Sequence, residues 1–131
     1  MGVMTNYLKQ KLLDHATGVS AYTSPTLYVG FSTTTPTAAG TNITEPVGNG
    51  YARIELTSNM GDAVNGAIFS VSAISTPQST GSWGTLTHSV LFNASTAGIA
   101  LYFDDLTTSR TVETGTTITI AASALSIRLN D

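Results

Sequence analysis

The sequence has no cysteine, few charged residues and no long hydrophobic run. The absence of cysteine excludes disulfides, thiol chemistry and Cys-ligated zinc. Charged residues make up only 10% of the 131-residue chain, against about 25% in ordinary globular domains. No apolar stretch approaches the roughly 20 residues of a membrane helix, and the N-terminal residues lack the apolar run of a secretory signal peptide. We therefore expect neither a membrane partner nor export through such a signal.

The basic residues are too few and too scattered to form a phosphate-binding patch. Five Lys and Arg are spread along the chain and the net charge is −3, so we expect no nucleic-acid binding. Hydroxyl side chains, 23 Thr and 14 Ser, supply the polarity instead. Such a surface costs less to desolvate than a charged one, which favours lasting contact with other subunits. A β-rich structural or secreted protein without an assembly role is the alternative, because Thr also favours strands.

Helical spacing of apolar residues occurs only near the N-terminus. The positions that share this spacing are Leu8, Leu12 and Ala16. Thr5 or Asn6 can serve as the N-cap, and Gly18 is suited to end the helix. We expect a helix over residues 5–17. It is too short to be stable alone, so it either packs on its own domain or projects toward a partner subunit.

From residue 26 onward, apolar residues recur at every second position rather than about every 3.6 positions. This alternation, with turn signals at Asn49-Gly50 and Asn65-Gly66, predicts a β domain over residues 26–129. The expected strands cover 26–32, 51–58, 67–73, 85–93, 99–104, 116–121 and 125–129, with a further short strand near 111–113. Residues 33–50 have no period and form a long loop, either a contact arm or an ordered surface loop.

The chain is therefore expected to be one domain over residues 1–131. Its predicted fold is mainly β, an antiparallel β-sandwich or barrel-like domain of about seven or eight strands with one N-terminal helix.

Residues of the types used in catalysis occur without suitable partners. His88 falls on the apolar face of a predicted strand, where a hydrogen-bonded core or interface role is expected. Ser89 follows it, but neighbouring strand residues point to opposite faces. Asp104-Asp105 could contribute to a calcium site but is better explained as a solvated strand end. We expect no catalytic, cofactor-binding or metal-binding residues and no enzymatic activity.

Aromatic residues and one arginine are the candidates for contact with partners. Trp83, set among glycines, could be a core corner, an interface anchor or a platform for a sugar. Tyr51 and Arg53 lie on the polar face of a predicted strand, where Arg53 could serve assembly or pair with an acid across the sheet. The full set of expected interface residues is Tyr7, Tyr28, Pro36, Tyr51, Arg53 and Trp83.

Several sequence runs resemble a family of small virion proteins of tailed bacteriophages. The most specific are residues 48–53 (Gly-Asn-Gly-Tyr-Ala-Arg) and 83–88 (Trp-Gly-Thr-Leu-Thr-His). Members are variously described as tail-fibre, minor tail or virion structural proteins, and the resemblance covers nearly the whole chain. One departure is Thr35, where related chains often carry an acid before the proline. The resemblance implies a non-enzymatic structural protein of the virion and supplies no catalytic residues.

The head and the tail are two possible locations on such a particle. The chain contains no heptad or collagen-like tract that could build a fibre shaft, so the sequence analysis favours a capsid decoration or cement subunit on the head. It would then bind the major capsid protein and form a homodimer or homotrimer. The alternative is a small tail-fibre or tail-tip component that contacts other tail proteins and could bind a host-surface glycan.

Overall fold

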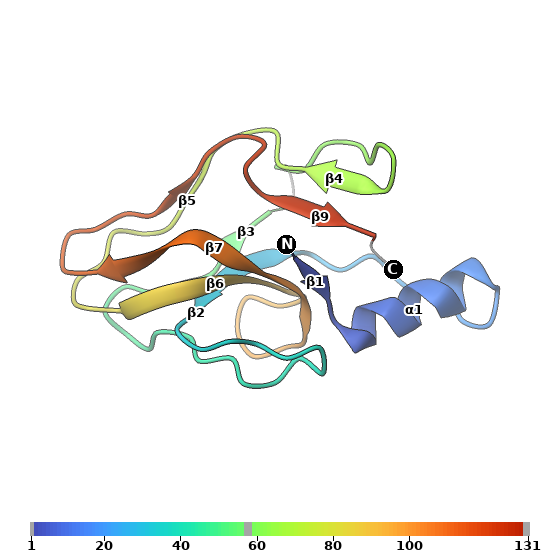
Figure 1. Cartoon of the computed structure of the whole chain (residues 1–131), viewed down its shortest axis with the longest axis horizontal. Coiled ribbons are helices and arrows are strands. Elements are labelled where there is room, and N and C mark those ends of the chain that lie inside the picture. The colour runs from blue at the N-terminus through green and yellow to red at the C-terminus, as the bar shows by residue number, and fades with distance from the viewer. Residues whose placement is uncertain (1, 57–58, 130–131) are drawn as a thin grey trace.

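The computed structural model describes residues 2–56 and 59–129, and a five-stranded antiparallel sheet lies at its centre (Figure 1). Its strands, in spatial order, are β1 (Val3–Met4), β7 (Ala100–Val112), β6 (Gly84–Phe92), β2 (Tyr28–Ser32) and β3 (Ile54–Glu55). Two small ribbons pair β4 (Ala67–Phe69) with β9 (Ser126–Arg128), and β5 (Ile74–Ser75) with β8 (Thr119–Ile120). Helix α1 (Asn6–Ala16) follows β1. The expected mainly β, antiparallel fold with an N-terminal helix is thus confirmed, as an open, sandwich-like arrangement.

The central sheet is buried on both faces. On one face, Phe31 and Leu91 belong to a core cluster that also contains Ile74 and Leu125, from the region of the two ribbons. The other face carries a second cluster. Its buried members are Val90, Phe92, Ala100 and Phe103, with Val3 and Ile43 packed against them. Figure 1 shows the ribbons on one side of the sheet and the loop that contains Ile43 on the other.

The long loop of residues 33–50 is ordered and covers the second face. Backbone N–H of Thr44 donates to Ser32 Oγ (3.0 Å), and Thr34 Oγ1 donates to the carbonyl of Asn42 (2.7 Å). The loop also reaches the helix, because the amide of Asn6 donates to the carbonyl of Ala38 (2.8 Å). The loop therefore serves as an irregular second layer of the fold.

Helix α1 begins and ends at positions that the sequence indicates. Thr5 is the N-cap, and its hydroxyl accepts from the amide of Leu8 (3.4 Å) and donates to the carbonyl of Ala100 on β7 (2.9 Å). At the other end Gly18 has φ of +79°, a left-handed conformation that costs little without a Cβ atom. Thr5 is fully buried, so one side chain both starts the helix and ties it to the sheet.

The helix lies at one end of the molecule and has no fully buried residue (Figure 1). Leu8 and Leu12 are half-buried and pack against the core, whereas Leu13 is 65% exposed. The sequence left open whether the helix packs on its own domain or projects toward a partner subunit. In the structure it packs on its own domain, along the narrow stripe of Leu8 and Leu12.

Several strand boundaries differ from those expected. The separate strands predicted at 99–104 and 111–113 are one strand, β7, because β6 pairs with both of its halves. Strands β1 and β5 were not predicted, since two-residue pairings leave no periodic signal. The segments predicted at 51–58, 67–73, 116–121 and 125–129 form shorter strands; Thr57 and Ser58 lie outside the described residues.

Candidate interaction surfaces

Arg53, directly before β3, forms a buried ion pair with Glu45 of the long loop. Arg53 Nε lies 3.0 Å from Glu45 Oε2, and its second terminal nitrogen lies 2.5 Å from Oε1, a bidentate geometry. The remaining terminal nitrogen donates to the carbonyls of Ala94 (2.7 Å) and Ala97 (2.8 Å) in the β6–β7 loop. The guanidinium carbon also lies 3.5 Å above the ring centroid of Phe92. Only 6% of the Arg53 side chain and 20% of the Glu45 side chain are exposed.

Tyr51 extends this pair into a network. Its hydroxyl donates to Glu45 Oε2 (2.6 Å) and accepts from the backbone amide of Phe31 on β2 (3.0 Å). Burial, and then the hydrogen bond to Glu45, raise the pKa of Tyr51 far above its ordinary value of 10.0. The phenol is therefore held as a neutral donor to the carboxylate.

Trp83 joins the network through Tyr51. Its ring packs edge-on against Tyr51, with the ring centroids 5.2 Å apart, and its Nε1 donates to the carbonyl of Asn49 (2.8 Å). The residue is 4% exposed. The indole faces are thus occupied by the protein and offer no platform on which a sugar could stack.

Gly30 is required where the network touches the sheet. A Cβ atom added there would lie 2.7 Å from Glu45 Oε2, 2.8 Å from the Tyr51 hydroxyl and 2.9 Å from the Phe92 ring. No larger residue fits without displacing several of these groups. Neither Gly30 nor Glu45 is predicted from the sequence, in which Glu45 is only an isolated acid a few residues before Arg53.

Of the six residues expected at an interface, three meet in this network and three lie apart. Tyr28 is half-buried on β2, with its hydroxyl 3.3 Å from Glu55 Oε1. Tyr7 is half-buried on α1, its ring 5.6 Å from the ammonium of Lys11, and Pro36 is buried in the long loop. Contact of any of the six residues with a partner protein stays a prediction.

His88 lies within the protein, paired to an acid on the neighbouring strand. Its Nε2 lies 2.8 Å from Asp105 Oδ1, and its Nδ1 lies 2.8 Å from Thr87 Oγ1. His88 is 7% exposed, whereas the Asp105 side chain is 73% exposed. β7 carries a bulge here: Leu86 pairs with Arg110 and His88 with Asp105, so four β7 residues lie opposite the single residue Thr87.

An apolar groove opens beside helix α1 and leads into the core. Its volume is about 420 Å³. Leu8 and Leu12 of the helix form one wall, and Ile68 and Ile127 of the β4–β9 ribbon form the other. Tyr102, on the central sheet, also lines it and is 3% exposed. Because so much apolar surface meets solvent at one place, this groove is the candidate contact surface with the strongest physical reason to be covered.

Two classes of site are not found in the described part of the chain. Residues 2–56 and 59–129 contain no group of three or more His, Asp or Glu side chains placed to hold a metal ion. The same residues include no helix with the length and hydrophobicity needed to cross a membrane.

Comparison with known proteins identifies a family of phage fibre proteins. A search of curated proteins finds no match to the sequence. A family model does match residues 3–128, which is nearly the whole chain, and its description is "Podophage GP4 fiber I protein gp80". The resemblance seen in the sequence to virion structural and tail-fibre proteins is thereby confirmed. The chain belongs to this Gp80 family of phage fibre proteins and is a structural protein of the virion.

Proposed function

We propose that the chain is a subunit of the phage tail fibre. The single observation that carries the proposal is the match of residues 3–128 to a fibre family. That description favours the tail over decoration of the head, although the lack of a shaft-forming tract in the sequence favours the head.

The geometry supports a subunit that offers fixed surfaces to other proteins. The Arg53 guanidinium pins the long loop through Glu45 and the β6–β7 loop through two carbonyls, so both loops are held in one arrangement. Surfaces that are already ordered lose less conformational entropy on binding. The partners in this proposal are other tail proteins of the same virion.

In this proposal the chain works without catalysis. If the assembled fibre binds a host-surface glycan, the sugar binds away from the Trp83 ring, which is enclosed by the protein. An enzymatic activity that is lost in a folded His88→Ala variant would contradict the non-catalytic part of the proposal.

Copy number and position in the virion test the tail assignment. We expect quantitative mass spectrometry of purified virions to give few copies per particle, and cryo-electron microscopy to place them on the tail. Particles that lack the chain should lose adsorption to the host while their heads keep their thermal stability. A copy number in simple ratio to the major capsid protein, with heads that break at lower temperature without the chain, would overturn the proposal in favour of decoration.

A further inference from the structure

A second cleft lies between β7 and the segment that leads from β8 to β9, and we call it the β7 cleft. Its volume is about 300 Å³, at the lower end of the range of small-molecule sites. The residues that line it are 104–108 and 110 of β7, 118–121, 124–126, Phe31 and Ser89. The chemistry of this lining indicates which small molecule the cleft can hold.

A row of side chains across three strands forms the floor of the β7 cleft. Ser89 of β6 lies directly opposite both Phe31 of β2 and Asp104 of β7, so the three share one face of the sheet. Phe31 and Ser89 are buried. Ile118 and Leu125 also line the cleft and belong with Phe31 to the main core cluster. The floor is therefore apolar at Phe31 and becomes polar toward β7.

The sides of the β7 cleft carry both donors and acceptors of hydrogen bonds. The guanidinium of Arg110 only donates, whereas an ionised carboxylate such as that of Asp104 only accepts. The hydroxyls of Thr107, Thr119 and Ser126 can do either. Arg110, Thr107 and Thr119 are exposed, so these groups are accessible to a ligand.

Strand β7 is irregular where it lines the cleft. Its bulge places residues 106–109 opposite the single residue Thr87. Three of these four residues, Leu106, Thr107 and Thr108, line the cleft. Bulges are common beside functional sites, where they change the direction of side chains. The irregular part of the strand and the cleft therefore coincide.

This lining matches a neutral sugar better than a charged or an apolar ligand. An apolar ligand would displace water from Arg110 and Asp104 without replacing the lost hydrogen bonds. An anion would meet the carboxylates of residues 104 and 105, and a cation would meet Arg110. Each hydroxyl of a sugar can donate to a carboxylate or accept from a guanidinium, and the C–H face of the ring is apolar like the floor.

We propose that the β7 cleft binds the terminal sugar of a neutral glycan, with Arg110 donating to sugar hydroxyls and Asp104 accepting from them. The small volume suits the end of a glycan chain rather than an internal stretch. That the glycan comes from the host surface rests on the proposed function as a tail subunit. Sugar binding itself is measured on the purified chain, so it can fail while the tail assignment holds, and the reverse.

Saturation-transfer difference NMR on the purified chain tests the proposal. The neutral probes are the methyl glycosides of glucose, galactose, mannose and rhamnose. Methyl glucuronide is the charged comparison, because it replaces the CH₂OH group of the glucoside with a carboxylate. We expect transfer to at least one neutral glycoside and weaker binding of the glucuronide. Arg110→Ala should raise the dissociation constant of the bound glycoside at least about tenfold, because the charged hydrogen-bond donors are lost.

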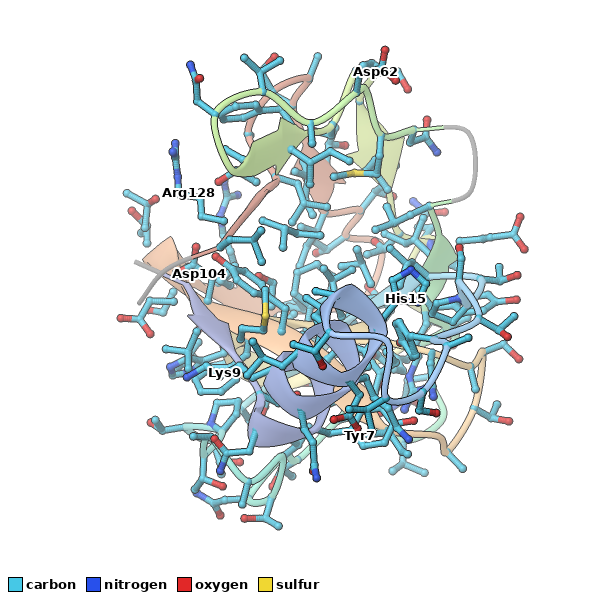
Figure 2. The ribbon with its side chains drawn as sticks, turned by 90° about the vertical axis from the view of Figure 1, so that its right-hand side faces the viewer. Tyr7, Lys9, His15, Asp62, Asp104 and Arg128 are labelled. Atoms are coloured by element: carbon cyan, nitrogen blue, oxygen red, sulfur yellow. The ribbon has the colours of Figure 1, made fainter. Side chains whose placement is uncertain are left out.

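Arg128→Ala is the matched control. It removes the same charge from β9, on the same side of the molecule as Asp104 (Figure 2), and Arg128 does not line the cleft. We expect its dissociation constant to equal that of the wild-type chain. Far-UV circular dichroism and thermal melts check that both variants fold.

Three results would overturn the proposal. The first is the absence of transfer to every neutral glycoside, and the second is tighter binding of the glucuronide than of any of them. The third is equal binding by the wild-type chain and a folded Arg110→Ala variant, or equal losses in Arg110→Ala and Arg128→Ala.

Discussion

Arg53 shows how a residue with the sequence features of a surface contact can act inside the molecule. Its four hydrogen bonds end on one carboxylate and on two backbone carbonyls of the β6–β7 loop. The sequence predicts Arg53 on the polar face of a strand, and such a face is expected to be exposed to solvent. In the structure Arg53 lies directly before β3, its side chain is buried, and Glu45 of the long loop supplies the opposite charge.

Truncation of Arg53 should therefore destabilise the fold. Arg53→Ala leaves the Glu45 carboxylate largely buried and unpaired, and we expect a loss of about 3 kcal/mol in the free energy of unfolding, measured by urea denaturation. Arg53→Lys should recover only part of the loss, because an ammonium cannot make the same bidentate contact. Arg110→Ala, at an exposed position of β7, is the control and should change stability by less than about 0.5 kcal/mol. Equal effects of Arg53→Ala and Arg110→Ala would contradict a structural role for the network.

Tyr51 makes stability depend on pH in the alkaline range. Its pKa is raised by burial and by the hydrogen bond to Glu45, so the folded chain keeps a proton that the unfolded chain loses near pH 10. The stabilisation is therefore fully present below pH 10 and is lost as pH rises above it. Burial also raises the pKa of Tyr22 and of Tyr102, which adds to the same trend.

Urea denaturation at pH values from 8 to beyond 10 measures this effect. We expect Tyr51→Phe to flatten the alkaline fall in the free energy of unfolding, and absorbance at 295 nm to show Tyr51 ionising only as the protein unfolds. Tyr28→Phe is the control, because the Tyr28 hydroxyl contacts Glu55 at the exposed edge of the sheet. An unchanged alkaline slope in Tyr51→Phe would rule Tyr51 out as its source.

At the scale of elements, helix α1 depends on its first residue. The Thr5 hydroxyl caps the helix and also donates to a β7 carbonyl, although the whole side chain is buried. We expect Thr5→Ala to cost about 1–2 kcal/mol in the free energy of unfolding, while Thr5→Ser should keep most of the stability. Thr17→Ala at the exposed C-terminal end of the helix is the matched control. Hydrogen exchange of the first helical turn should increase in Thr5→Ala, and equal protection in the two alanine variants would contradict the capping role.

The sequence predicts helices and strands well where apolar residues recur at regular spacing or a helix-capping residue is present. The helix, its end at Gly18 and the long strands β2 and β6 follow directly from apolar spacing. The continuous strand β7 was divided in two because its middle residues, 105–111, are mostly polar and contain a bulge that interrupts the alternation. Pairings of two residues, such as β5 with β8, are determined by tertiary contacts rather than by local sequence.

At the scale of the whole molecule, the candidate surfaces depend on contacts between distant segments. The run 48–53 was recognised as distinctive, but the partner of Arg53 could not be predicted, since only the folded loop brings Glu45 beside it. The groove combines the helix, the sheet and the β4–β9 ribbon, and no single stretch of sequence contains it. The expectation of an assembly role came from composition, whereas the groove is a tertiary feature that composition could not predict.

The bond from Thr5 to Ala100 spans 95 positions of the chain, and β1 pairs with β7 over a similar distance. During synthesis, helix α1 leaves the ribosome long before the strand that anchors it has been made. The apolar stripe of the helix must therefore wait for β7, and long-range pairings of this kind fold slowly. The time between translation of α1 and of β7 is thus the interval in which a newly made chain is most open to premature association with its neighbours.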